Sequence, residues 1–138
     1  SVGTAFPFYR ATLTPAGVEG VMGMGSWNPK TSAGAKAYFD AHVASQKKEP
    51  DRWASGACWA SMEILTSAVG KVGLDRKAIR DYIANTDHST ILGKIKFNGS
   101  ENVGTPGTVS QWQNGEFEVV WPKAVATAAL NPNKPAWK

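Results

Sequence analysis

The stretch that decides the fold is residues 53–73, which read WASGACWASMEILTSAVGKVG. Between Arg52 and Lys71 it carries one charged residue, Glu63. Its small and apolar positions recur at intervals of three and four residues, the period of one helix face; they are Ala54, Ala57, Cys58, Ser61, Met62, Leu65, Ala68, Val69 and Val72. The other sides are mostly Ala, Ser, Gly and Trp. The sequence therefore predicts a helix that neighbouring elements cover on most of its surface.

The length and composition are those of one ordinary globular domain. A chain of 138 residues, 42% hydrophobic and 19% charged, buries roughly two thirds of its unfolded surface. No apolar run approaches the roughly 18 to 20 residues that cross a bilayer, and we expect a signal peptide to be absent or removed. The net charge is +4, but the Lys and Arg residues are scattered, which argues against nucleic-acid binding.

Strands and helices follow one another in a mixed order. We expect first an irregular lead-in over 1–17 with at most one short helical turn, and then a strand over 18–24. Three helices follow, capped by Thr31 or Ser32, by Asp51 and by Asp75. A strand over 93–98 turns at Asn98-Gly99, and strands over 108–113 and 116–121 are joined at Asn114-Gly115. A short Ala-rich helix is expected after Pro122. This order is typical of an α/β or α+β domain.

No combination of side chains predicts catalysis. Cys58 lies within the apolar helix, where a cysteine is usually a small buried hydrophobe. His42 is expected to be a partly exposed helix residue, and His88 to have a capping or surface role in a polar loop. A single cysteine excludes an intramolecular disulfide and a CxxC metal site. We therefore predict a protein that is not an enzyme and has no metal or cofactor.

Tryptophan is the informative residue type, because six are present and several stand at the ends of predicted elements. Trp53 and Trp112 are expected to be buried in the core. Trp27 follows a predicted strand, and ligand crevices of open α/β sheets lie beyond the carboxyl ends of strands. Trp59 lies in the first turns of the central helix, close to Gly56. Aromatic side chains at such positions are typical walls for a small apolar or aromatic ligand.

Three separated blocks together resemble the C-terminal portion of type I periplasmic binding proteins. They are residues 53–73 followed by Asp75-Arg76, ILGKIKFNGSEN over 91–102, and VSQWQNGEFEVVWP over 109–122. The branch with the greatest similarity is the leucine/isoleucine/valine-binding type, which serves ABC importers. Its hallmarks in this portion are a long Ala-rich helix, a strand with Gly-x-hydrophobic-x-Phe, and a hairpin with Gln-Trp-Gln-x-Gly-x-Phe. The resemblance runs from about Val18 to the end of the chain.

The resemblance implies an α/β fold with two three-layer lobes joined by three crossing strands, of which this chain forms a C-terminal part. Residues 1–27 would belong to the C-terminal lobe and end at the hinge. Residues 28–108 would belong to the N-terminal lobe, with a hinge crossing near 100–108, and 109–138 would return to the C-terminal lobe as a hairpin and helix. Such a piece completes neither sheet, so we expect a companion N-terminal segment or chain.

The function implied by the resemblance is that of the solute-binding component of an ABC importer, periplasmic or extracellular, which delivers a small organic ligand to a membrane permease after its signal peptide is removed. An aromatic residue at the start of the long helix closes over the ligand in this family, and here that residue is Trp59, where amino-acid-binding members commonly have Tyr. Its indole favours a flat ligand, such as an aromatic acid, a branched-chain or aromatic amino acid, or an amide. Ser26 and Trp27 are further candidates for the same cleft. A ligand-sensing regulator of this fold and a small α/β enzyme are the alternatives.

Overall fold

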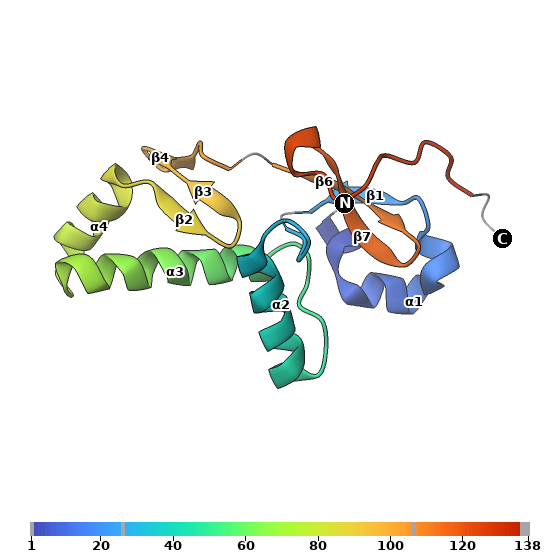
Figure 1. The fold of residues 1–138 in the computed structure, drawn as a ribbon, viewed down its shortest axis with the longest axis horizontal. Helices are drawn as coiled ribbons and strands as arrows, with labels where there is room; N and C mark the ends of the chain where they lie inside the picture. The colour runs from blue at the N-terminus through green and yellow to red at the C-terminus, as the bar shows by residue number, and fades with distance from the viewer. Residues whose placement is uncertain (1, 26, 106, 136–138) are drawn as a thin grey trace.

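The computed structural model describes residues 2–25, 27–105 and 107–135. Its elements are the 3-10 helix η1 (Val2–Ala5), α1 (Pro7–Val18), β1 (Met22–Met24), α2 (Ala33–Gln46), α3 (Ser55–Val72), α4 (Arg76–Asn85), β2 (His88–Thr90), β3 (Gly93–Ile95), β4 (Phe97–Asn98), β5 (Glu101–Asn102), β6 (Val109–Gln113), β7 (Glu116–Trp121) and the 3-10 helix η2 (Lys123–Val125). Figure 1 shows α3 and α4 with β2, β3 and β4 at one end of the molecule. Helix α1 and strands β1, β6 and β7 lie at the other end, and α2 lies between them.

Strands β1, β6 and β7 form a three-stranded sheet in that order, and both of its pairs are antiparallel. The β6–β7 hairpin places Trp112 opposite Phe117 and turns at Asn114 and Gly115, which have φ angles of 52° and 80°. Positive φ at both turn positions is what an Asn-Gly turn provides, so the predicted hairpin is confirmed. Two further antiparallel ribbons, β2–β3 and β4–β5, lie near α3 and α4.

The N-terminal residues form a helical layer against the sheet, where an irregular lead-in was predicted. Ala5 and Val18 share one hydrophobic cluster with Trp112 and Phe117. Pro7 starts α1, which is kinked where Thr14 takes a φ of 65° before Pro15, because a residue before proline is pushed out of the helical region. The prediction for 1–17 was wrong because aromatic residues far along the chain stabilise these turns.

Helix α3 buries one narrow stripe rather than most of its surface. Its buried residues follow one another at intervals of four, namely Gly56, Ala60, Ile64 and Ala68. Ala60 and Ile64 pack on Ile95, and the side chain of Met62 is 57% exposed. Cys58 is also exposed. The predictions of a helix covered on most sides and of a buried Cys58 are therefore wrong for the residues that the structure describes.

Side-chain caps mark the starts of α2 and α4 as predicted, whereas the N-cap position of α3 is Ala54 and Asp51 lies three residues before it. The Ser32 hydroxyl accepts a hydrogen bond from Ala35 N at 3.0 Å, and the Asp75 carboxylate accepts one from Ala78 N at 2.7 Å. The Asp51 carboxylate accepts hydrogen bonds from the backbone of Trp53 and Ala54 just before α3 begins. Each of these side chains satisfies backbone N–H groups that lack a partner in the first turn of a helix.

Several other local predictions need correction. The segment around His88 is strand β2 rather than a loop, and the imidazole is buried between Tyr82 and Phe97, with Nε2 3.0 Å from Ile83 O. Trp112 is buried as predicted, but Trp53 is 38% exposed. The strand predicted over 93–98 is divided into β3 and β4. Pro122 is followed by the 3-10 helix η2, where a short Ala-rich helix was predicted.

Candidate functional site

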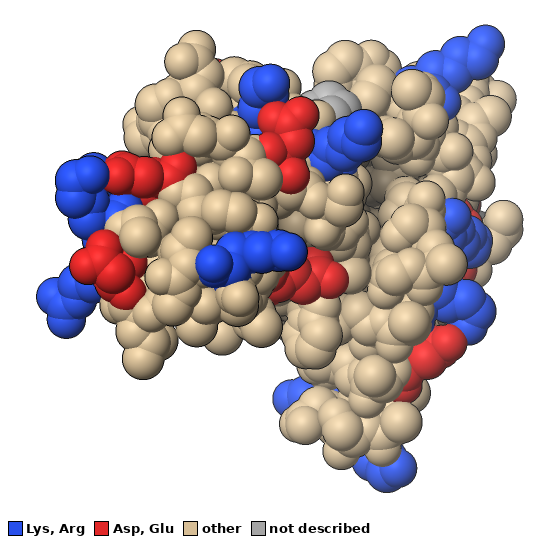
Figure 2. Space-filling model, turned by 60° about the vertical axis from the view of Figure 1, so that its left-hand side comes forward, with Lys and Arg blue, Asp and Glu red and all other residues tan. Residues whose placement is uncertain are grey.

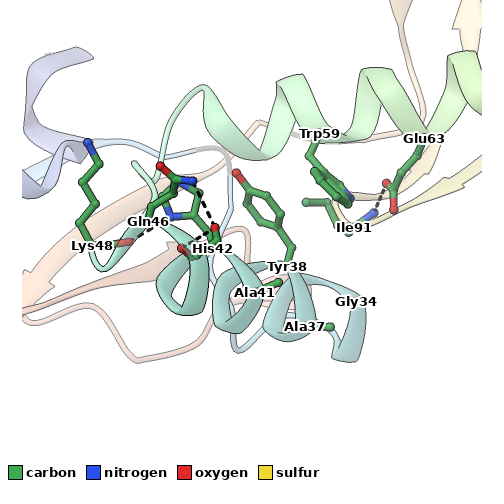
Figure 3. A pocket seen from close by; sticks show the side chains of 11 residues that line it. Gly34, Ala37, Tyr38, Ala41, His42, Gln46, Lys48, Trp59, Glu63 and Ile91 are labelled. Atoms are coloured by element: carbon green, nitrogen blue, oxygen red, sulfur yellow. Dashed lines mark hydrogen bonds between the residues drawn. The ribbon is translucent and has the colours of Figure 1, made fainter.

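A hollow of about 640 Å³ opens between α2 and α3 (Figure 3). Its lining comes from four places: one face of α2, the segment just after α2, the first half of α3, and the turn after β2. The lining residues are Gly34, Ala37, Tyr38, Ala41, His42, Ser45, Gln46, Lys48, Trp59, Glu63 and Ile91. On α2 they follow the three-and-four spacing of a single face. Because three of them are Gly or Ala, this face leaves room beside the helix.

An aromatic pair crosses the hollow. Tyr38 points from α2 toward Trp59, which points down from α3 (Figure 3). Their ring centroids are 5.0 Å apart with an interplanar angle of 37°, within the range of favourable aromatic contacts. Trp59 is 48% exposed, so part of its indole remains open to a ligand. This arrangement can hold a flat or apolar group against two rings.

Trp27 supports this pair instead of lining the same hollow. Its ring centroid is 5.3 Å from that of Tyr38, and the side chain is 2% exposed. The indole Nε1 donates a hydrogen bond to Asp51 O at 2.9 Å. A Cβ added at Gly56 would lie 2.7 Å from the Trp27 ring, so α3 reaches this ring only because residue 56 is glycine. Trp27 thereby fixes the first turn of α3, from which Trp59 projects.

Trp27 does line a second, smaller hollow of about 60 Å³, together with Thr31, Leu92, Thr105, Thr108, Val119 and Val125. The third predicted site residue, Ser26, lies outside the described residues. The structure thus places Trp59 on the large hollow and Trp27 behind its aromatic wall. Whether these residues bind a ligand stays a prediction.

Polar groups stand at the two ends of the large hollow (Figure 3). At one end, Glu63 Oε2 accepts a hydrogen bond from Ile91 N at 3.0 Å. At the other end, His42 Nδ1 lies 3.0 Å from Lys48 O. A carbonyl oxygen only accepts, so Nδ1 donates in this contact. The hollow therefore offers an acidic end, an aromatic middle and an end with His42 and Lys48.

The connection between α2 and α3 is held by Arg52, whose side chain is buried. Its guanidinium lies 4.8 Å from the Phe39 ring centroid and 5.5 Å from that of Trp27, and it pairs with Glu49 at 3.2 Å. Burial lowers the pKa of Arg52, and the carboxylates of Glu49 and Glu116 oppose that shift. Cation–π contact and ion pairing together compensate for burial of the charge. They also join the segment before α3 to Phe39 of α2.

Sequence reasoning missed Tyr38 and Glu63 as parts of this hollow. The sequence predicted no role at a site for Tyr38, and Glu63 stood out only as the one charged residue between Arg52 and Lys71. The available signal was the run of small residues beside Tyr38 on one face, at Gly34, Ala37 and Ala41. Small residues on the face of a helix that also carries an aromatic residue leave space around its ring.

Outside the large hollow, three features bear on function: surface charge, metal-binding side chains and membrane-spanning helices. Figure 2 shows Lys and Arg interspersed with Asp and Glu, without a field of one sign on the face in view. Across 2–25, 27–105 and 107–135, the structure contains no group of three or more His, Cys, Asp or Glu side chains able to hold a metal ion. In the same ranges, no helix has both the length and the apolar character to span a membrane.

Comparison with known proteins gives matches among solved structures. No protein-family model and no curated protein matches the sequence. An ABC transporter substrate-binding protein from Desulfitobacterium hafniense, in complex with Leu, has a TM-score of 0.62 and 18% identity, and the match covers 74% of this chain and 31% of that one. The benzoate complex of a solute binding protein of an ABC transporter from R. palustris has a TM-score of 0.69 and 21% identity, with 86% and 34% covered.

A leucine binding protein from Thermotoga maritima is similar as well, with a TM-score of 0.60, 20% identity, and 84% of this chain and 32% of that chain covered. The chain thus spans about a third of the length of each of these proteins. At these sequence identities the likeness is one of fold. It confirms the predicted mixed helix-and-sheet class, and it confirms the resemblance to periplasmic binding proteins as a resemblance of fold. The chain has the fold of part of an ABC transporter substrate-binding protein.

Proposed function

We propose that this protein is a solute-binding component of an ABC importer and has no catalytic activity. The observation that carries the proposal is the aromatic pair of Tyr38 and Trp59 at a hollow of about 640 Å³. The volume is that of a small-molecule site, and such sites are mostly apolar with a few polar groups. The fold likeness to ABC transporter substrate-binding proteins supports the same role.

Capture and delivery is the proposed mechanism. The ligand lies between two lobes, and contacts made in both favour the closed state, which a membrane permease then recognises. In this assignment residues 1–27 belong to one lobe up to the hinge. Residues 28–108 belong to the other lobe, with a crossing near 100–108, and 109–138 return to the first. The location that follows from this role is periplasmic or extracellular.

The proposed ligand is a small organic molecule with a flat or branched apolar part: an aromatic acid, a branched-chain or aromatic amino acid, or an amide. Trp59 supplies the exposed wall, and Tyr38 packs against its ring and extends the same aromatic wall. Trp27 acts behind them as a support. Ser26 keeps its place as a candidate next to Trp27.

The test is ligand binding to Trp59→Ala, measured by isothermal titration calorimetry with leucine, phenylalanine, benzoate and benzamide as probes. Covering an aromatic face contributes on the order of 1.5–3 kcal/mol, so the variant should bind at least about tenfold more weakly. Trp121→Ala is the matched control, because Trp121 is 57% exposed and does not line the hollow. Unchanged affinity in Trp59→Ala would contradict the assignment of the wall.

A companion N-terminal segment or chain is the second part of the proposal. The exposed side of α3, where Met62 and Leu65 face outward, is a surface that such a companion would cover. Intact-mass spectrometry of the purified protein should reveal a mass greater than that of these 138 residues, or a second chain that co-purifies. A monomer with the mass of these residues alone would require another account of the two lobes.

A further inference from the structure

Glu63 stands beside the aromatic pair, at the end of the hollow formed by Ile91 (Figure 3). It is half-buried and is the only charged residue between Arg52 and Lys71. One carboxylate oxygen, Oε2, accepts the hydrogen bond from Ile91 N. An ionised carboxylate has further acceptor positions, so this contact leaves part of its capacity for another donor.

Glu63 has no ion-pairing partner among the residues that the structure describes. The nearest basic lining residue on the hollow, Lys48, lies at the opposite end (Figure 3). The lined face of α2 runs from Gly34 to Gln46, which at 1.5 Å per residue is about 18 Å.

A further hollow of about 220 Å³, distinct from the one lined by Trp27, is also lined by Glu63. Asp87, Tyr82 and His88 also line it, and Asp87 forms an ion pair with Lys96 at 3.3 Å. Of the two carboxylates that line this 220 Å³ hollow, Asp87 has Lys96 as its cation partner, whereas Glu63 forms no ion pair among the described residues. A half-buried carboxylate without a paired cation favours a positively charged neighbour over a negatively charged one.

We propose that the large hollow binds a flat ring bearing a cationic nitrogen, an amidinium or an ammonium, with the ring against Trp59 and Tyr38 and the nitrogen directed to Glu63. Two features favour such a ligand independently. Charge-assisted hydrogen bonds to a carboxylate are strong, and aromatic faces attract cations. The inference rests on the proposed function and narrows its ligand class to molecules that carry an amine or amidine beside an aromatic ring.

The experiment compares three planar probes of nearly equal shape: benzamidine, benzamide and benzoate. Calorimetric titration of the protein should give benzamidine an affinity at least about tenfold higher than the other two. Glu63→Gln should remove most of that preference and leave benzamide binding within about twofold. The Gln side chain keeps an acceptor for Ile91 N, so the turn after β2 is retained. Glu101→Gln, an exposed acid on β5 outside both hollows, should leave all three affinities unchanged.

The outcomes distinguish failure of this inference alone from failure of the broader proposal. Benzamide and benzoate binding that depends on Trp59, without any preference for benzamidine, would overturn the cation inference and leave the binding role intact. A preference for benzamidine that survives Glu63→Gln would also overturn it. The preference of the unaltered protein is measured without any variant, so a folding defect in Glu63→Gln cannot hide the answer. If none of the probes bound in the hollow, both proposals would fail.

Discussion

The two hydrophobic clusters of this chain differ in how far they reach along the sequence. The cluster of Trp112 and Phe117 includes residues near the N-terminus, and Trp112 Nε1 donates a hydrogen bond to Thr4 O at 2.8 Å, across 108 positions. The cluster of Ala60, Ile64 and Ile95 draws on nearby segments only. The first closes around its aromatic rings, whereas the second leaves one side of α3 in solvent. A helix that looks like a core helix in sequence is thus packed along one side only among the described residues.

Buried polar side chains reinforce the same difference. At the sheet end, Gln111 Nε2 donates to Gly20 O at 3.1 Å, and Gln111 Oε1 accepts from Asn131 N at 2.9 Å. Glu118 is held there by Lys30 and Asn28. These side chains join the hairpin to the lead-in, to the segment before α2 and to the C-terminal tail. Buried hydrogen bonds of this kind are costly to break, so we expect this end to unfold as one unit.

The largest expected effect is at Trp112. Trp112→Ala removes a buried ring and its hydrogen bond to Thr4 O, and we expect it to lower the free energy of unfolding by about 3–5 kcal/mol. Met62→Ala, on the exposed side of α3, should change it by about 0.5 kcal/mol or less. Urea unfolding followed by circular dichroism measures both values. Equal losses in the two variants would mean that the outer side of α3 is as well packed as the sheet end.

Short-range signals account for what the sequence predicted correctly. Ser32, Asp51 and Asp75 mark helix starts because a capping side chain acts on backbone groups within three or four positions. Asn114-Gly115 marks the hairpin because its turn needs positive φ at two adjacent residues. In each case the atoms that decide the structure are neighbours in the chain.

The failures have long-range causes. Helix α1 contains Pro15 and lacks a side-chain cap, yet Arg10 donates a hydrogen bond to Gly115 O at 2.5 Å and Trp112 packs on the same layer. His88 was assigned to a surface loop because its neighbours are polar, but Tyr82 and Phe97 enclose it from other elements. Neither contact can be read from local patterns.

The candidate site was predictable only in part, because it combines a residue that the sequence identified with one that a distant connection brings into place. Trp59 was identified through resemblance, and its exposure and position on the hollow are compatible with that role. Tyr38 joins it only because the connection through Asp51 and Arg52 turns α2 back toward α3. The orientation of one helix against another depends on this connection, which carries no periodic pattern.

A smaller effect should appear at two glycines of α3. One lies at the packed start of the helix and the other near its exposed end. A Cβ at Gly56 would meet the Trp27 ring at 2.7 Å, whereas one at Gly70 has nothing within 4 Å. We expect Gly56→Ala to destabilise the protein by about 1–3 kcal/mol, because the buried indole must move. Gly70→Ala should instead stabilise it by up to about 1 kcal/mol through helix propensity. Thermal unfolding of both variants provides the measurement.

The glycine pair also tests whether the supporting ring and the ligand wall are coupled. Displacement of Trp27 would pass to Tyr38 at 5.3 Å and from there to Trp59 at 5.0 Å. Gly56→Ala should therefore alter the near-ultraviolet circular dichroism of the aromatic residues, and Gly70→Ala should leave that spectrum unchanged. If both variants were stabilised alike and kept the spectrum of the parent, the start of α3 would not rest on Trp27. The hollow would then owe its shape to the loop between α2 and α3 alone.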